Sequence, residues 1–212
     1  MVVIETLTGA TLAVEIAENP APAAEDVAHL GLQLASAVHY LHRNGYLHLD
    51  LKPSNVIAEA GRAKLIDLSL ARPPGEHHAG IGTYHYMAPE QASGGLLSEA
   101  ADVWGLGAVL FEGATGEAPF DDDPDAYATV ASASGTYSDA EPERYPQLER
   151  AARPLESVRA GLDSALSELI AACLAPQPHD RPSLDELLAA LEPIAELPDS
   201  ERRWTLAQSR SR

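Results

Sequence analysis

Four polar side chains in the first third of the chain have the types and spacing that phosphoryl transfer needs: Asp50, Lys52, Asn55 and Asp67. A carboxylate such as that of Asp50 can orient a hydroxyl group and accept its proton, and the ammonium of Lys52 can steady a terminal phosphate. Amide and carboxylate oxygens, such as those of Asn55 and Asp67, are ligands that Mg²⁺ accepts. Taken alone, an Asp-x-Lys-x-x-Asn segment is more often a polar turn, so its surroundings must decide.

The elements around these residues are a long helix and a short β-ribbon. Apolar residues recur at helical spacing over residues 24–44, and Asn44-Gly45 predicts the end of this helix. The runs 56–58 and 63–66 flank a turn and predict a hairpin. We expect the helix to lead into the segment that carries Asp50, and we expect the two acidic motifs to lie at opposite ends of the ribbon.

The remaining pattern predicts mostly helices joined by loops. A short β-rich run precedes the first helix, and two segments rich in Pro, Gly or acidic residues interrupt the later helices. Ser183 is a candidate N-cap of the last helix. The predicted elements are a strand at 2–7, a loop at 72–82, a helix at 99–113, a surface connection at 121–147, and amphipathic helices at 156–174 and 183–195.

Composition narrows the class of protein. The formal net charge of −18 and a pI near 4.6 oppose binding to nucleic acid, because phosphate backbones are held mainly by Lys and Arg. The acidity indicates either a solvated surface or a preference for basic substrates. A single cysteine, Cys173, lies in an apolar run and is predicted to be a buried, inert thiol, which fits a reducing cytoplasm. No segment predicts a membrane span or a secretion signal.

The eight histidines could be considered as metal ligands, but no cysteine partners or ligand spacing support a metal cluster. We expect loop and helix-surface positions for most of them, and a core position supporting the Asp50 segment for His48. The residues weighed for a metal cluster are His39, His42, His77, His78 and His85.

The order of motifs decides between a chance turn and an active centre. Segment 48–55 is followed by Asp67-Leu68-Ser69, by Ala88-Pro89-Glu90, by Asp102 in an apolar helix, and by Arg181. Over roughly residues 2–195 this order resembles the C-terminal lobe of a protein serine/threonine kinase, most strongly the bacterial type. The resemblance implies a mainly α-helical lobe with a small β-ribbon beside the active centre.

The same resemblance implies a function and a set of roles. The reaction is transfer of the ATP γ-phosphate to Ser or Thr hydroxyls of a protein substrate, with Mg²⁺ as cofactor. Asp50, Lys52 and Asn55 would be catalytic, and Asn55 with Asp67 would hold the metal. Structural roles fall to Asp102, which would brace the catalytic loop, and to Glu90 and Arg181, which would pair. The residues expected at the adenine are Glu5, Leu7 and Ile57.

Two departures from the family pattern concern regulation. Leu49 replaces the arginine that usually precedes the catalytic aspartate and receives an activation-loop phosphate, and residues 70–82 contain no Ser, Thr or Tyr. We therefore expect a protein that is not switched by phosphorylation of this loop. Leu68-Ser69 replaces Phe-Gly after the metal-binding aspartate, and we expect Leu68 to fill an apolar slot.

The third departure is that the sequence has no counterpart of the glycine-rich loop and strand lysine of the N-terminal lobe. The expected domain is a truncated kinase domain over residues 1–197, followed by a disordered tail at 198–212. One hypothesis is an active kinase whose remaining part lies upstream. The alternatives are a catalytically silent, pseudokinase-like module whose exposed cleft face is covered by a partner, and a small lobe supplied by a separate polypeptide.

Overall fold

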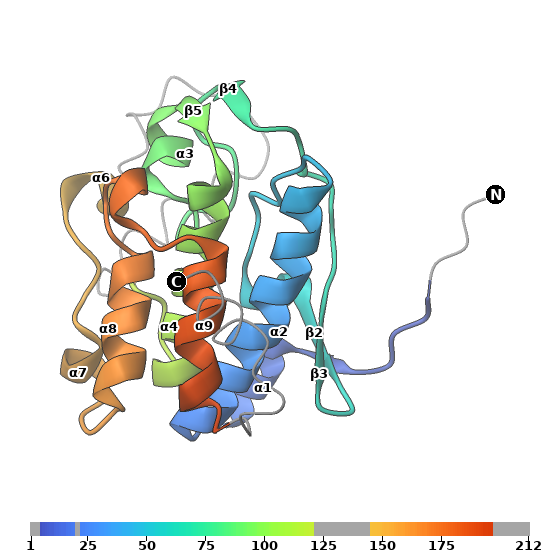
Figure 1. Cartoon of the computed structure of the whole chain (residues 1–212), viewed down its shortest axis with the longest axis vertical. Coiled ribbons are helices and arrows are strands. Elements are labelled where there is room, and N and C mark those ends of the chain that lie inside the picture. The colour runs from blue at the N-terminus through green and yellow to red at the C-terminus, as the bar shows by residue number, and fades with distance from the viewer. Residues whose placement is uncertain (1–4, 20–21, 121–144, 197–212) are drawn as a thin grey trace, which may run out of the picture.

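The computed structural model describes residues 5–19, 22–120 and 145–196, and these form a mainly helical body with small β-elements at its side and top (Figure 1). The prediction of a mainly α fold with a small β-ribbon is confirmed. The helices are α1 (Leu12–Glu18), α2 (Ala24–Arg43), α3 (Pro89–Ser93), α4 (Glu99–Thr115), α6 (Pro146–Glu149), α7 (Leu155–Val158), α8 (Ser164–Cys173) and α9 (Leu184–Ile194), with 3₁₀ turns at Pro53–Asn55 and Pro178–Asp180. The strands are β1 (Ala10–Thr11), β2 (Val56–Glu59), β3 (Arg62–Leu65), β4 (Gly75–His77) and β5 (Gly95–Leu97).

Helix α4 forms the centre of the core because it is apolar on almost every side and is buried along most of its length. It packs against α2 and α8, and Trp104 stacks on Phe120 with ring centroids 6.0 Å apart. The contact with α8 is so close that a Cβ on Gly107 would lie 2.6 Å from Cβ of Cys173. Glycine at this position therefore lets the two helices approach.

Helix α2 confirms the predicted helix at 24–44. Its first turn carries Glu25 and Asp26, whose charges favour the positive end of the helix dipole. Asn44 ends the helix, and Gly45 follows with a φ of 79°. One face of α2 packs on α4 and α9. The C-terminal end of α2 leads directly into the segment that contains Asp50.

The predicted hairpin is confirmed as the antiparallel pair β2–β3, in which Val56 faces Leu65 and Glu59 faces Arg62. Ala60 and Gly61 form the turn with positive φ at both positions, as the right-handed twist of a two-residue hairpin requires. β1 extends this sheet by pairing with β2.

The prediction of a strand at 2–7 is not supported where the structure describes it. Residues 5–8 lie outside any strand, and residues 2–4 lie outside the described part of the chain. Strand pairing begins only at Ala10, while Thr8 is attached to the ribbon by its backbone N–H and hydroxyl, which both donate to Glu59. Side-chain hydrogen bonds therefore replace the expected backbone ladder here.

Two further predictions need correction, and one helix was not predicted. The helix predicted at 156–174 is divided into α7 and α8 by Gly161, which has a φ of 79°, and Asp163 caps α8 by accepting a hydrogen bond from Leu166 N–H. The loop predicted at 72–82 contains β4, which pairs with β5 and is too short to show periodicity. Helix α1 has no counterpart among the predicted elements.

Two of the later helices lie where the sequence predicts them. The helix predicted at 99–113 is α4, and the one at 183–195 is α9, where Ser183 and Glu186 form a reciprocal capping box. Most of the predicted connection at 121–147 and the whole tail at 198–212 lie outside the described residues. Within the described ranges, no helix combines the length and the apolar character needed to span a membrane.

Candidate active site

The loop at residues 48–55 is fixed from below by Asp102 of α4. One carboxylate oxygen of Asp102 accepts the backbone N–H of His48 at 2.7 Å, and the other accepts that of Leu49 at 2.8 Å. Asp102 is 1% exposed, so these bonds form in a region shielded from water. They hold Leu49 at a φ of 65°, which is costly for a non-glycine residue. The predicted bracing role of Asp102 therefore has a direct structural counterpart.

Asp50 is the hub of a compact polar cluster. Its Oδ2 lies 2.8 Å from Nζ of Lys52 and accepts a hydrogen bond from Nδ2 of Asn55 at 2.9 Å. Its Oδ1 accepts the hydroxyl hydrogen of Thr83 at 2.6 Å. Asn55 also donates to the backbone carbonyl of Asp50, which closes the loop on itself. The structure thus brings Asp50, Lys52 and Asn55 together.

The hydroxyl of Thr83 shows what this cluster can do chemically. The hydroxyl donates its hydrogen to Asp50 and accepts a hydrogen bond from Nζ of Lys52 at 2.8 Å. A carboxylate on the proton side and an ammonium on the lone-pair side orient the hydroxyl for proton removal. Any acceptor hydroxyl that took the place of Thr83 would find the same two partners.

Asn55 and Asp67 lie at one end of the ribbon and not at opposite ends, which corrects the prediction. Asn55 directly precedes β2 and Asp67 follows β3, and the backbone N–H of Ile66 donates to the carbonyl of Asn55 at 2.9 Å. In an antiparallel hairpin the start of the first strand and the end of the second meet at the same edge. The two oxygen donors are therefore neighbours.

The donor set at this edge fits Mg²⁺. Asn55 uses Nδ2 on Asp50, and its Oδ1 accepts no hydrogen bond from the described residues. Hydrogen bonds from Ser69 lower the pKa of Asp67, and the positive charge of Lys52 lowers this pKa further. Asp67 is thus ionised, and it is exposed to solvent, so it can act as a hard oxygen ligand together with Asn55.

His48 and Leu68 refine two other predictions. His48 is fully buried, as predicted, and its Nδ1 accepts the backbone N–H of Asp50 at 3.2 Å. Burial lowers the pKa of His48, against the opposing effect of the nearby Asp102. Leu68 is 54% exposed and does not fill the expected apolar slot.

The residues expected at the adenine are only partly brought together. Glu5 is exposed and pairs with Nζ of Lys64 at 2.6 Å. Ile57 faces Lys64 across the β2–β3 ladder, so both side chains lie on the same face of the ribbon. Leu7 is half-buried and makes no polar contact with the described residues. Lys64 therefore lies next to both Glu5 and Ile57. Among the described residues, no such shared partner connects Leu7 to them.

Glu90 and Arg181 form the predicted ion pair. The guanidinium donates from Nη1 to Oε1 of Glu90 at 2.6 Å and from Nη2 to Oε2 at 2.9 Å. It also lies over the ring of Trp104, with 5.0 Å to the centroid. This pair attaches the segment that follows Thr83 to the helical core.

Two buried glutamines were missed by the sequence reasoning. Nε2 of Gln91 donates to the carbonyls of Leu49 and Ile81, and its Oε1 accepts the N–H of Ala88. Nε2 of Gln147 donates to carbonyls of the segment after Thr83. The one available signal was a polar residue three positions after Ala88, which suits an N3 capping position.

Two of the histidines weighed as metal ligands are buried, one on a helix and one in a turn. His42 is buried on α2, and its Nε2 lies 2.8 Å from Oδ2 of Asp102. His85 is buried beside Tyr84, with ring centroids 4.9 Å apart. His42 therefore belongs to the support beneath the Asp50 loop.

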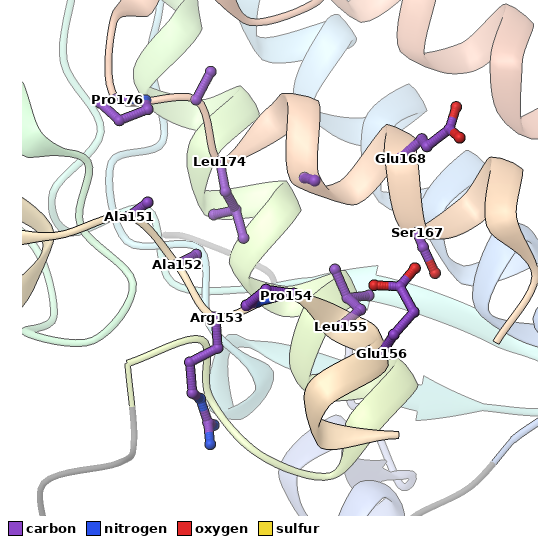
Figure 2. Close-up of a pocket in the computed structure, with 12 residues that line it drawn as sticks. Ala151, Ala152, Arg153, Pro154, Leu155, Glu156, Ser167, Glu168, Leu174 and Pro176 are labelled. Carbon is purple, nitrogen blue, oxygen red and sulfur yellow. The ribbon is translucent and has the colours of Figure 1, made fainter. Parts of the chain in front are cut away.

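Two pockets in the described part of the chain lie away from this site. A pocket of about 360 Å³ lies between the segment at 151–156 and α8, and Figure 2 shows that Pro154, Leu155 and Leu174 contribute to its apolar walls. A second pocket, of about 230 Å³, lies between α1 and α2. Neither pocket is lined by Asp50 or its partners, so the chemistry of the polar cluster is what identifies the candidate site.

Comparison with known proteins agrees with this chemistry. A sequence model of the protein kinase domain matches residues 1–191. The probable serine/threonine-protein kinase PkwA of Thermomonospora curvata is 35% identical over 167 residues, which cover 76% of this chain and 20% of that protein. The serine/threonine-protein kinase PrkC of Bacillus subtilis is 34% identical over 126 residues, which cover 57% of this chain and 19% of that protein.

A probable serine/threonine-protein kinase of Clostridium acetobutylicum is 27% identical over 186 residues, which cover 85% of this chain and 26% of that protein. The chain thus spans about a fifth to a quarter of the length of these curated relatives. The family match covers most of the described residues, including the whole polar cluster. On these grounds the chain belongs to the protein kinase family, as a member of its bacterial serine/threonine type.

Proposed function

We propose that this chain transfers the γ-phosphate of ATP to Ser or Thr hydroxyls of a protein substrate. The observation that carries the proposal is the hydroxyl of Thr83 held between Asp50 at 2.6 Å and Lys52 at 2.8 Å. This is the environment that an acceptor hydroxyl needs, and it is built by two residues of one loop. The serine/threonine kinases among the relatives support the same reaction.

In the proposed reaction the acceptor hydroxyl takes the position of the Thr83 hydroxyl. Its oxygen forms a bond to the γ-phosphorus, the bond from that phosphorus to the ADP leaving oxygen breaks, and the hydroxyl proton passes to Asp50. Lys52 steadies the negative charge of the transferred phosphoryl group. Asp50 is already oriented for this role by Asn55 and by the backbone bonds to Asp102.

Asn55 and Asp67 would hold Mg²⁺, and the ion supplies neutralisation of phosphate charge when it is bound. The side chain of Asn55 is fixed by Asp50, and that of Asp67 by the N–H of Ser69 at 3.1 Å. For the nucleotide base, Ile57 offers an apolar surface, and Glu5 and Leu7 lie on the segment that we assign to the adenine edge.

We infer that the catalytic loop is held in place without activation-loop phosphorylation. Leu49 offers no charged side chain, but its carbonyl accepts a hydrogen bond from Gln91 at 2.9 Å. The same Nε2 donates to the carbonyl of Ile81 at 2.7 Å. Gly82 is packed so closely that a Cβ at this position would lie only 2.9 Å from the carbonyl oxygen of Leu49. These contacts can tether the two segments permanently.

The test is a phosphotransfer assay with the full chain, radiolabelled ATP, Mg²⁺ and a library of Ser- and Thr-containing peptides. We expect transfer that Asp50→Asn reduces by roughly 10²–10⁴-fold, the usual contribution of a positioned proton acceptor. Glu25→Gln, which changes an exposed carboxylate on α2, is the matched control and should leave the rate unchanged. Equal rates in Asp50→Asn and the unaltered chain would remove Asp50 from its role. A folded chain without any transfer would favour the catalytically silent module.

A further inference from the structure

We propose that the C-terminal segment of this chain docks in the pocket between α1 and α2, with Trp204 as the anchor and Arg202 and Arg203 on the acidic rim. No residue of the Asp50 cluster lines this pocket, and its occupancy does not depend on the proposed reaction. Residues 197–212 lie outside the described part of the chain. The shape of the pocket, the point where the chain leaves α9, and the charges of the two partners favour this docking.

The pocket has an apolar floor and an acidic rim. Its volume is about 230 Å³, below the range of roughly 300–1,000 Å³ typical of drug-sized ligands and suited to one large side chain. Leu12, Ile16 and Leu30 contribute to the floor, and Glu15 and Asp26 stand at the rim. Neither carboxylate makes an ion pair or side-chain hydrogen bond with the described residues.

The chain leaves α9 close to this pocket. Helices α2 and α9 run antiparallel, because His39 pairs with Asp185 near one end and the Cα of Gly31 faces Leu191 farther along. Continuing this register places the end of α9 beside the first turn of α2, and Figure 1 shows both ends at the lower edge of the molecule. That first turn contains Asp26, which lines the pocket.

The segment can reach the pocket. Trp204 is eight positions after Glu196, the end of the described part, and an extended chain over eight such steps spans about 26 Å. The pocket lies around the side of α2 from the face that α9 covers. Because a helix with its side chains is only about 10–12 Å across, this reach is ample.

The chemistry of the segment complements the pocket. Residues 197–212 carry four arginines, against Asp199 and Glu201 as the only acidic side chains, in a chain whose formal net charge is −18. Arg202 and Arg203 stand directly before Trp204. An aromatic side chain flanked by arginines is the composition that dominates binding energy at protein interfaces. Charge and shape thus point to the same occupant.

The pocket beside α8 fits this occupant less well. Arg153 lines it, and its guanidinium donates to Glu117 and to the carbonyl of Ala118. A second group of arginines would meet this cation at short range. Although Glu156 and Glu168 also line that pocket, they serve better as the control site than as the docking site.

Tryptophan fluorescence tests the proposal in the full chain, because the sequence has only two tryptophans and Trp104 is 0% exposed. Quenching by acrylamide therefore reports Trp204 almost alone. We expect Trp204 to be protected in the unaltered chain and to be exposed in the double variant Glu15→Lys with Asp26→Lys. Loss of two rim charge pairs should weaken the docking equilibrium about tenfold.

The matched control is the double variant Glu156→Lys with Glu168→Lys, which makes the same charge change at the other pocket and should leave Trp204 protected. A synthetic peptide of residues 197–212 gives the fully exposed reference. The proposal is overturned if Trp204 in the unaltered chain is quenched as readily as in this peptide, or if both double variants expose it equally. Protection that depends on protein concentration would assign the tail to a second copy and overturn docking within one chain.

Discussion

The ion pair of Glu90 with Arg181 gives the sharpest prediction on stability. The guanidinium side chain is 0% exposed and that of Glu90 is 13% exposed, so the pair lies almost entirely out of water. Glu90→Gln keeps the shape of the side chain and removes its charge. Arg181 would then remain buried without an anion, although the carbonyls of Ala100, Ala175 and Pro176 would still accept its hydrogen bonds.

Removing one partner of a buried pair typically destabilises a protein by about 3–5 kcal/mol. Because the three carbonyls and the isosteric amide preserve part of the network, we expect the lower end, about 3 kcal/mol. For a domain of this size each kcal/mol lowers the midpoint by roughly 2–4 °C, so the expected shift in Tm is about 6–12 °C. Urea unfolding followed by circular dichroism should show a lower midpoint with an unchanged slope.

The matched control is Glu117→Gln, which removes the charge from a pair with Arg153 in which Glu117 is 52% exposed. Exposed pairs contribute about 0.2–1 kcal/mol, so this variant should unfold close to the unaltered chain. The reasoning is refuted if Glu90→Gln costs no more than Glu117→Gln. In that case burial would not determine how much the Glu90 pair contributes to the free energy of unfolding.

Four smaller predictions follow from single contacts. Burial lowers the pKa of His48 below its unfolded value of 6.5, so the unfolded state binds more protons. The free energy of unfolding, measured by urea titration, should therefore fall as pH drops below about 6.5. His48→Gln should weaken this dependence on pH. Burial raises the pKa of Cys173 to about 12, so a thiol reagent at pH 8 should modify it only after unfolding, and rapid modification of the folded chain would contradict this. Gly107→Ala should cost about 1–3 kcal/mol by forcing α4 and α8 apart, whereas Gly113→Ala, whose Cβ would lie 3.6 Å from the nearest atom, should be tolerated in the same unfolding assay. Gln91→Met should increase hydrogen exchange in residues 70–82 more than Gln33→Met does, because only Gln91 connects this segment to the carbonyl of Leu49; equal exchange would refute the tether.

The sequence predicted the elements whose cause is local. The long helix at 24–44 and the ribbon were predictable because helical periodicity and turn residues act within a few positions. Ser183 was predictable as an N-cap for the same reason. The break at Gly161 was missed because the apolar spacing on its two sides continues through it, although glycine and the following Asp163 were available signals.

The candidate site was predictable in its residues and less so in its arrangement. Asp50, Lys52 and Asn55 lie within six positions, so their convergence follows from one loop. Asn55 and Asp67 lie close together because of strand pairing across the ribbon. Sequence spacing alone placed their motifs at opposite ends of it. Gln91 and Gln147 act on backbone carbonyls many residues away, and side-chain type carries no signal for such partners.

The central claim is that Asp50 and Lys52 act on one hydroxyl as a unit, and a double-mutant cycle of phosphotransfer tests it most directly. The full chain, Asp50→Asn, Lys52→Met and the double variant would be compared in single-turnover transfer from ATP to a Ser-containing peptide. Residues that act together show strongly non-additive losses. The account predicts that the double variant is about as slow as the slower single variant. It is contradicted if the two losses multiply, or if neither substitution slows transfer.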